Sequence, residues 1–110
     1  MTHPLAGKWR IVEMELWDRE FIDLIGPGYI AFDDEGSGDF AFGAVTGTLD
    51  CGYAKASIHF TWEGNDEMDE AAGDGWAELQ DDGLISGEIG FQHGDESSFI
   101  AKRWTSSTAC

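Results

Sequence analysis

One acidic segment of the chain, from Glu63 to Gly75, carries the densest group of side chains that could bind a ligand. Its hard oxygen ligands are Asn65, Asp66, Glu67, Asp69, Glu70 and Asp74. Calcium and magnesium take such oxygens, but the spacing does not match the D-x-[DN]-x-[DN]-G-x5-E pattern of an EF-hand. The segment has 13 residues, whereas hairpin connections usually take about two to five. We therefore expect a long solvated acidic loop, with no metal site, as the place where a ligand engages.

Two tryptophans flank this segment, Trp62 before it and Trp76 after it. Paired across adjacent strands they would pin a hairpin, while at the mouth of a barrel they would form a stacking platform for a planar or sugar-like ligand. His59 alternates with the apolar residues around it, so it faces solvent if those residues fill the core, or lines a polar cavity with Thr61 if the barrel is hollow. The predicted ligand-binding residues are Trp62, Trp76, His59, Asn65, Asp66 and Glu67.

Motifs that would indicate catalysis are absent from the sequence. There is no G-x-S-x-G elbow, no glycine-rich phosphate loop before a helix and no C-x-x-C pair. Cys51 has no activating neighbour in the sequence, and His93 is expected in a turn at a strand end. We predict no catalytic residue and no cofactor, and the sequence favours binding over catalysis.

The charge of the chain limits its partners. Twenty-two acidic residues against six basic ones give a net charge of −16. Nucleic acids and anionic membranes need a basic patch that so few lysines and arginines cannot supply. A cationic small molecule or a basic protein partner fits this field better, and we expect a monomer or a homodimer.

Length and cysteine placement indicate one domain in a reducing compartment. A chain of 110 residues forms a single domain over residues 1–110. Residues 1–7 have neither the charged region nor the apolar run of a signal peptide. Cys51 and Cys110 are not placed as a disulfide framework, so both are expected as free thiols. The sequence therefore predicts a cytoplasmic protein.

Short apolar segments bounded by Gly, Asp or Asn predict the elements that position these residues. Expected strands cover Trp9–Met14, Tyr29–Phe32, Gly38–Asp50, Ala56–Trp62, Trp76–Gln80, Leu84–Phe91 and Ser98–Trp104. Within Gly38–Asp50, Gly43 and Gly47 suggest a bend. Apolar residues at roughly helical spacing predict one short helix within Glu15–Ile25. This pattern is typical of an all-β, small antiparallel up-and-down β-barrel with one short helix after the first strand.

The start of the first predicted strand, Gly7-Lys8-Trp9, resembles the G-x-W motif of lipocalins and related calycin barrels. In that family the tryptophan packs at the closed end of the barrel beneath a basic side chain from the last strand. The resemblance implies this role for Arg103, so we predict its guanidinium within about 6 Å of a buried Trp9 ring. The helix resembles the lid of fatty-acid-binding proteins, and the chain length is similar to that of streptavidin.

Most of the chain, including Phe42-Gly43-Ala44-Val45 and the run from Trp62 to Asp69, also resembles a group of small uncharacterised bacterial proteins. That likeness implies no activity.

The leading hypothesis is a calycin-like barrel that binds a small molecule at its open end. The alternative is an acidic protein-interaction or oligomerisation module. A hollow aromatic-lined barrel would favour the first, and a filled barrel with exposed apolar residues the second.

Overall fold

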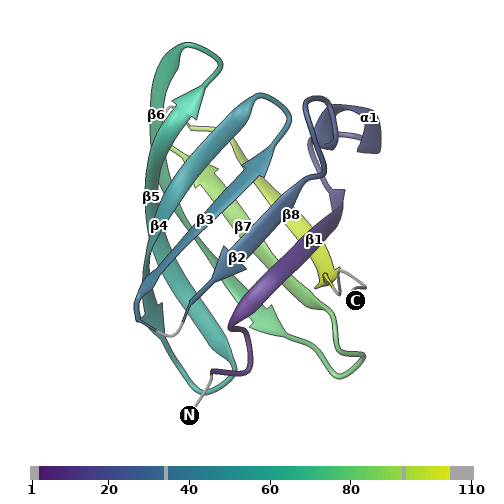
Figure 1. Cartoon of the computed structure of the whole chain (residues 1–110), viewed down its shortest axis with the longest axis vertical. Coiled ribbons are helices and arrows are strands. Elements are labelled where there is room, and N and C mark those ends of the chain that lie inside the picture. Colours follow the sequence, from purple (N-terminus) through teal and green to yellow (C-terminus); the bar gives the residue numbers. More distant parts are fainter. Residues whose placement is uncertain (1–2, 34, 93, 105–110) are drawn as a thin grey trace.

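The computed structural model describes residues 3–33, 35–92 and 94–104 and shows a closed antiparallel β-barrel (Figure 1). Its elements are β1 (Gly7–Met14), α1 (Arg19–Ile22), β2 (Tyr29–Phe32), β3 (Ser37–Phe42), β4 (Val45–Tyr53), β5 (Ser57–Asp66), β6 (Asp69–Leu79), β7 (Ile85–Phe91) and β8 (Glu96–Arg103). Each strand pairs with the next, and β8 pairs with β1. The predicted all-β up-and-down barrel with one short helix after the first strand is confirmed. Among the described residues, no helix has the length and apolar composition needed to cross a bilayer.

The barrel closes where Trp9 on β1 lies opposite Arg103 on β8. Trp9 is only 1% exposed, and the guanidinium carbon of Arg103 lies 4.1 Å from the centre of its ring. The indole N–H donates to the carbonyl of Leu5 at 2.9 Å, and the guanidinium donates to the carbonyls of Ala6 and Pro4. The predicted contact is therefore confirmed, and it joins the first strand, the last strand and the segment before β1.

Aromatic rings fill the interior. The ring centre of Trp62 lies 5.0 Å from that of Phe40 and 5.1 Å from that of Phe91, and all three side chains are buried. Glycines on the same inner face leave room for these rings, since a Cβ at Gly47 would stand 2.5 Å from the Phe40 ring and one at Gly73 would stand 2.9 Å from the Trp62 indole nitrogen. Interiors pack this densely when large and small residues face each other, and the described core is filled with side chains.

The acidic segment Glu63–Gly75 is not a loop, so that prediction is wrong. Residues 57–66 and 69–79 are strands, and only Glu67 and Met68 connect them. The inner face of β6 carries small residues, namely Ala71, Gly73, Gly75 and Ala77. They lie opposite bulky residues of β5, including Phe60 and Trp62. Because its large residues point outward and its small ones inward, β6 lacks the alternation by which a strand is usually recognised.

The structure also divides one predicted strand and gives the helix its bounds. The segment Gly38–Asp50 is divided into β3 and β4 by a turn at Gly43 and Ala44. Gly43 has φ +56°, and a Cβ there would stand 2.4 Å from the Phe21 ring, so only glycine fits. The helix is four residues long, with Asp18 as its N-cap accepting from the backbone N–H of Phe21.

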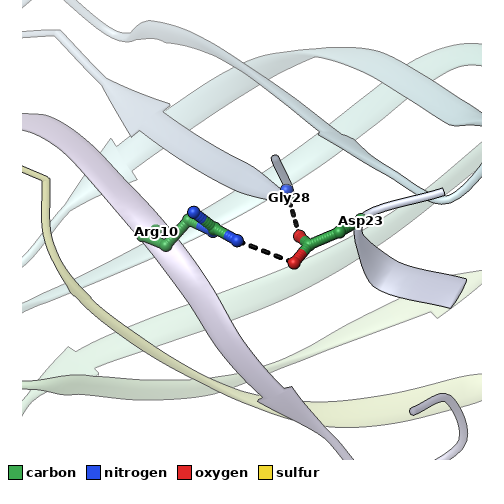
Figure 2. Close-up of polar contacts among 3 residues, drawn as sticks. All are labelled: Arg10, Asp23 and Gly28. Atoms are coloured by element: carbon green, nitrogen blue, oxygen red, sulfur yellow. Dashed lines mark hydrogen bonds and ion pairs between the residues drawn. The ribbon is translucent and has the colours of Figure 1, made fainter. Parts of the chain in front are cut away.

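An ion pair holds the segment after α1 against the barrel (Figure 2). Arg10 of β1 donates to Asp23 at 2.7 Å, and the second carboxylate oxygen of Asp23 accepts from the backbone N–H of Gly28 at 2.9 Å. Burial alone would raise the pKa of Asp23, but the hydrogen bonds from Gly28 and Arg10 and the nearby positive charge outweigh it, so the pKa lies below its usual value. The pair thus fixes the chain between α1 and β2.

Candidate functional site

The sequence-predicted site residues lie on two sides of the sheet. Trp62 points inward, is buried, and donates its indole N–H to the carbonyl of Gly90 at 3.1 Å. Trp76 and His59 are opposite each other in the β5–β6 register and point outward, whereas the partner of Trp62 is Gly73. The two tryptophans therefore neither pair across the hairpin nor share a platform.

His59 is exposed, as expected for a strand whose apolar face fills the core. Its neighbour Trp76 donates its indole N–H to the carboxylate of Glu88 at 3.2 Å. Both belong to the outer surface toward the end of the barrel away from the β5–β6 turn. Neither residue lines the groove on the outside of the barrel to which Asn65 contributes.

The remaining predicted residues, Asn65, Asp66 and Glu67, lie at the end of β5 and in the turn to β6. Asn65 faces a groove of about 880 Å³ that runs over the outside of the barrel. The polar side chains that line it are Tyr29, Asp39, Thr46, Thr48, Glu63, Asn65, Glu70 and Gln92. They come from β2 to β6 and from the residue that follows β7, so five neighbouring strands build one concave polar surface.

Three carboxylates give this groove its charge. Asp39 of β3, Glu63 of β5 and Glu70 of β6 are all exposed and stand on different strands of the groove. No lysine or arginine is among the residues that line it in the described part of the chain. A surface of this kind attracts a positively charged molecule and offers hydroxyl and amide groups for further hydrogen bonds.

Tyr29 fixes one wall of the groove. Its hydroxyl donates to Asp39 at 2.5 Å, and this hydrogen bond, together with burial, raises the pKa of Tyr29 to about 12. The phenol therefore stays protonated near neutral pH and holds Asp39 in place. Sequence reasoning missed Tyr29, Asp39, Thr46, Thr48 and Gln92. A single strand over Gly38–Asp50 would put Thr46 and Thr48 on the face opposite to Asp39. The turn at Gly43 and Ala44 shifts the alternation, so all three side chains lie on the outside, and the predicted pattern gave no signal for this shared face.

Cys51 lies within the described residues and is not an activated nucleophile. Burial raises the pKa of the Cys51 thiol to about 11, and the charges of Asp33 and Asp50 add to the effect, so the thiol is protonated at neutral pH. Across residues 3–33, 35–92 and 94–104, no group of three or more His, Cys, Asp and Glu side chains is arranged to hold a metal ion. His93 and Cys110 lie outside the described residues.

Comparison of the chain with models of protein families, with curated proteins and with solved structures finds no match.

Proposed function

We propose that the protein binds a small organic cation in the groove on the outside of β2 to β6. The observation that carries this proposal is the groove itself, which Asp39, Glu63 and Glu70 line from three strands with no lysine or arginine among the described residues around it. The filled interior supports an outer site, because Phe40, Trp62 and Phe91 occupy the place where a hollow barrel would hold a ligand.

Several residues predicted from the sequence enter this proposal. Asn65 lines the groove, while Asp66 and Glu67 follow it at the end of β5 and in the turn to β6 and do not line the groove. Trp62 supports its floor from below, since its ring lies under Gly47. A role for the outward pair of His59 and Trp76 in ligand contact remains a separate prediction.

Kinship with calycin barrels is also part of the proposal. The arrangement of Trp9 beneath Arg103 at the closure of the barrel is what the resemblance of Gly7-Lys8-Trp9 to the calycin motif implies. Calycins are associated with binding rather than catalysis, which agrees with a groove that holds no activated nucleophile. A cytoplasmic location remains a prediction from the sequence.

The chemistry of the groove predicts modest, salt-sensitive binding. Exposed ion pairs each contribute about 0.2–1 kcal/mol, so selectivity depends on a ligand that meets several carboxylates together. A linear or branched amine with two or more charges can contact Glu63 and Glu70 at once. Because exposed charges are screened by salt, affinity should fall as ionic strength rises.

The test is a thermal-shift screen with organic amines, followed by calorimetric titration of the best one. A molecule that binds only the folded state raises the melting temperature. We expect the rise to disappear in the double variant Glu63→Gln, Glu70→Gln and to persist in the matched variant Glu78→Gln, Glu88→Gln, whose outward carboxylates lie on β6 and β7 outside the groove. Equal loss in both variants, or no rise with any amine, would overturn the proposal.

A second candidate function, an interaction or oligomerisation module, is favoured by the filled barrel together with its exposed apolar residues. The end of the barrel that carries α1 exposes four large apolar side chains, namely Leu16 at 50%, Leu24 at 61%, Ile25 at 78% and Met68 at 97%. Apolar groups gathered on one end of a soluble protein often mark a contact surface. This candidate predicts self-association or capture of a protein partner through that end.

A further inference from the structure

The turn between β5 and β6 presents one apolar side chain among acids. Met68 is 97% exposed and is flanked along the chain by carboxylates, namely Asp66, Glu67, Asp69 and Glu70. The turn is tied to the rest of the barrel, because the backbone N–H of Glu67 donates to the carbonyl of Ala44 at 3.0 Å. Met68 is thus an apolar knob held on a fixed hairpin, and its full exposure leaves that apolar surface in water.

A hollow of about 250 Å³ lies on the neighbouring outer surface. Its side chains, mostly apolar or aromatic, are Lys8, Ile25, Pro27, Tyr29, Ala41, Phe42, Ala44, Thr46 and Trp104. Methionine is flexible and fills irregular apolar spaces of this kind. The hollow is therefore an apolar pocket large enough to accommodate one side chain.

The hollow also carries positive charge in a strongly acidic protein. The ammonium of Lys8 lies 4.3 Å from the ring centre of Tyr29 and 4.4 Å from that of Trp104. Among the described residues Lys8 makes no ion pair. Lys8 supplies the charge among the described residues that line the hollow, whereas Arg10 on the same face of β1 is paired with Asp23. The charge of the hollow is complementary to that of the hairpin tip.

The knob and the hollow lie at the same end of the molecule. Ala44 both lines the hollow and accepts the hydrogen bond from the turn that holds Met68. Figure 1 shows the β3–β4 turn, the β5–β6 turn and α1 at one end of the barrel. The exposed Leu24 and Ile25 belong to this end as well.

We infer that two copies of the chain associate through this end, each placing Met68 in the hollow of the other. Since each copy carries both parts, a two-fold axis between them makes the exchange reciprocal and closes the assembly as a dimer. The acidic neighbours of Met68 then approach the unpaired Lys8 of the partner copy. Leu24 and Ile25 add apolar surface around the contact. The inference does not depend on the cationic ligand of the outer groove.

The overall charge gives this dimer a distinctive salt dependence. Two chains of −16 repel each other, and salt screens repulsion between charges that are farther apart than a Debye length of about 8 Å at physiological ionic strength. The apolar contact of Met68 is not weakened by that screening. We therefore expect association to strengthen as salt is raised, whereas a dimer held mainly by ion pairs would weaken.

The experiment measures the dimer dissociation constant of the full chain by analytical ultracentrifugation. Met68→Ser removes the knob and Ala41→Phe fills the hollow, and each change should weaken association about tenfold or more. Met68→Leu should retain the dimer. Lys8→Glu should weaken it more than Lys55→Glu, which makes the same charge change in the turn after β4 at the other end of the barrel.

Mixing two defective variants gives the sharpest result. In a mixture of Met68→Ser with Ala41→Phe, the intact Met68 of one variant meets the open hollow of the other, so association should recover partly although each variant alone is monomeric. Circular dichroism should first show that both variants are folded. A wild-type chain that stays monomeric, a dimer indifferent to Met68→Ser, or a mixture that fails to associate would each overturn the inference.

Discussion

The seam between β1 and β8 and the sheet formed by β5, β6 and β7 occupy different sides of one barrel and use charge in different ways. The seam strands carry four of the six basic residues of the chain, namely Lys8, Arg10, Lys102 and Arg103. Residues 56–101, which contain β5 to β7, hold twelve acidic residues and neither lysine nor arginine. Charge is therefore distributed unevenly around the barrel, with most basic residues at the seam and many acidic residues on the other side.

The difference shows which charges serve the fold. At the seam, Arg103 packs on Trp9 and bonds two backbone carbonyls, and Arg10 holds Asp23. On the other side, Glu63 and Glu70 are exposed, so they can meet a ligand without loss of structure. Changes at the seam should alter stability, and changes in the groove should alter binding.

The largest effect is expected for Trp9→Ala at the seam. Removing a buried tryptophan leaves a cavity and typically costs about 3–5 kcal/mol of unfolding free energy. Trp76→Ala on the outer face of β6 should cost far less, because that side chain is only partly buried. Urea unfolding of the two variants measures the difference, and equal losses would contradict the distinction between seam and far side.

A smaller loss is expected for Arg103→Gln. The variant gives up the stacking on Trp9 and the hydrogen bonds to Ala6 and Pro4, at a cost of about 1–2 kcal/mol. Lys102→Gln, the adjacent exposed position, serves as the control and should stay within about 0.5 kcal/mol of the wild type. Denaturant midpoints of the two proteins provide the test. An Arg103→Gln variant as stable as the wild type would show that the Arg103 contacts at the seam do not stabilise the fold.

The ion pair of Asp23 predicts a pH-dependent contribution. Its pKa is lower in the folded chain than the usual 3.8, so the pair stabilises the fold above that pH and loses this contribution as the pH falls through the folded-state pKa. At neutral pH, Asp23→Asn should cost about 0.5–1 kcal/mol. The difference in unfolding free energy between the variant and the wild type should disappear in acid, as measured by unfolding at several pH values. A gap that is constant with pH would contradict this prediction.

The smallest effect on stability is expected in the groove. Glu63→Gln and Glu70→Gln remove exposed charges from an acidic surface, so unfolding free energy should change by no more than about 0.5 kcal/mol in either direction. Thermal unfolding without added ligand measures this change. A large destabilisation would show that these carboxylates support the fold, as the seam residues do.

The structure of the seam could be predicted from the sequence better than the structure of the side formed by β5, β6 and β7. The contact of Trp9 with Arg103 that closes the barrel is expected in advance, because the resemblance of Gly7-Lys8-Trp9 to the calycin motif implies it. Alternation likewise gives Tyr29–Phe32 with the bounds that the structure shows. The helix is expected in the right place but over a longer range than Arg19–Ile22.

The far side is harder to predict for a physical reason. In β6 the inner positions Gly73 and Gly75 are small because the rings of Trp62 and Phe60 fill the space opposite them. That requirement depends on a neighbouring strand and leaves no apolar alternation in β6 itself. The groove depends on how five strands curve together, so residues as distant as Tyr29 and Gln92 meet there only in the folded barrel.

Amide chemical-shift mapping during titration with an organic amine distinguishes a binding surface outside the filled barrel from one inside it. Shifts should concentrate at Thr46, Asn65 and Glu70 along the groove and remain small at Ile58 and Ala101, which are buried in the core. Shifts centred on the buried residues, or on His59 and Trp76 instead of the groove, would contradict a binding site in the groove.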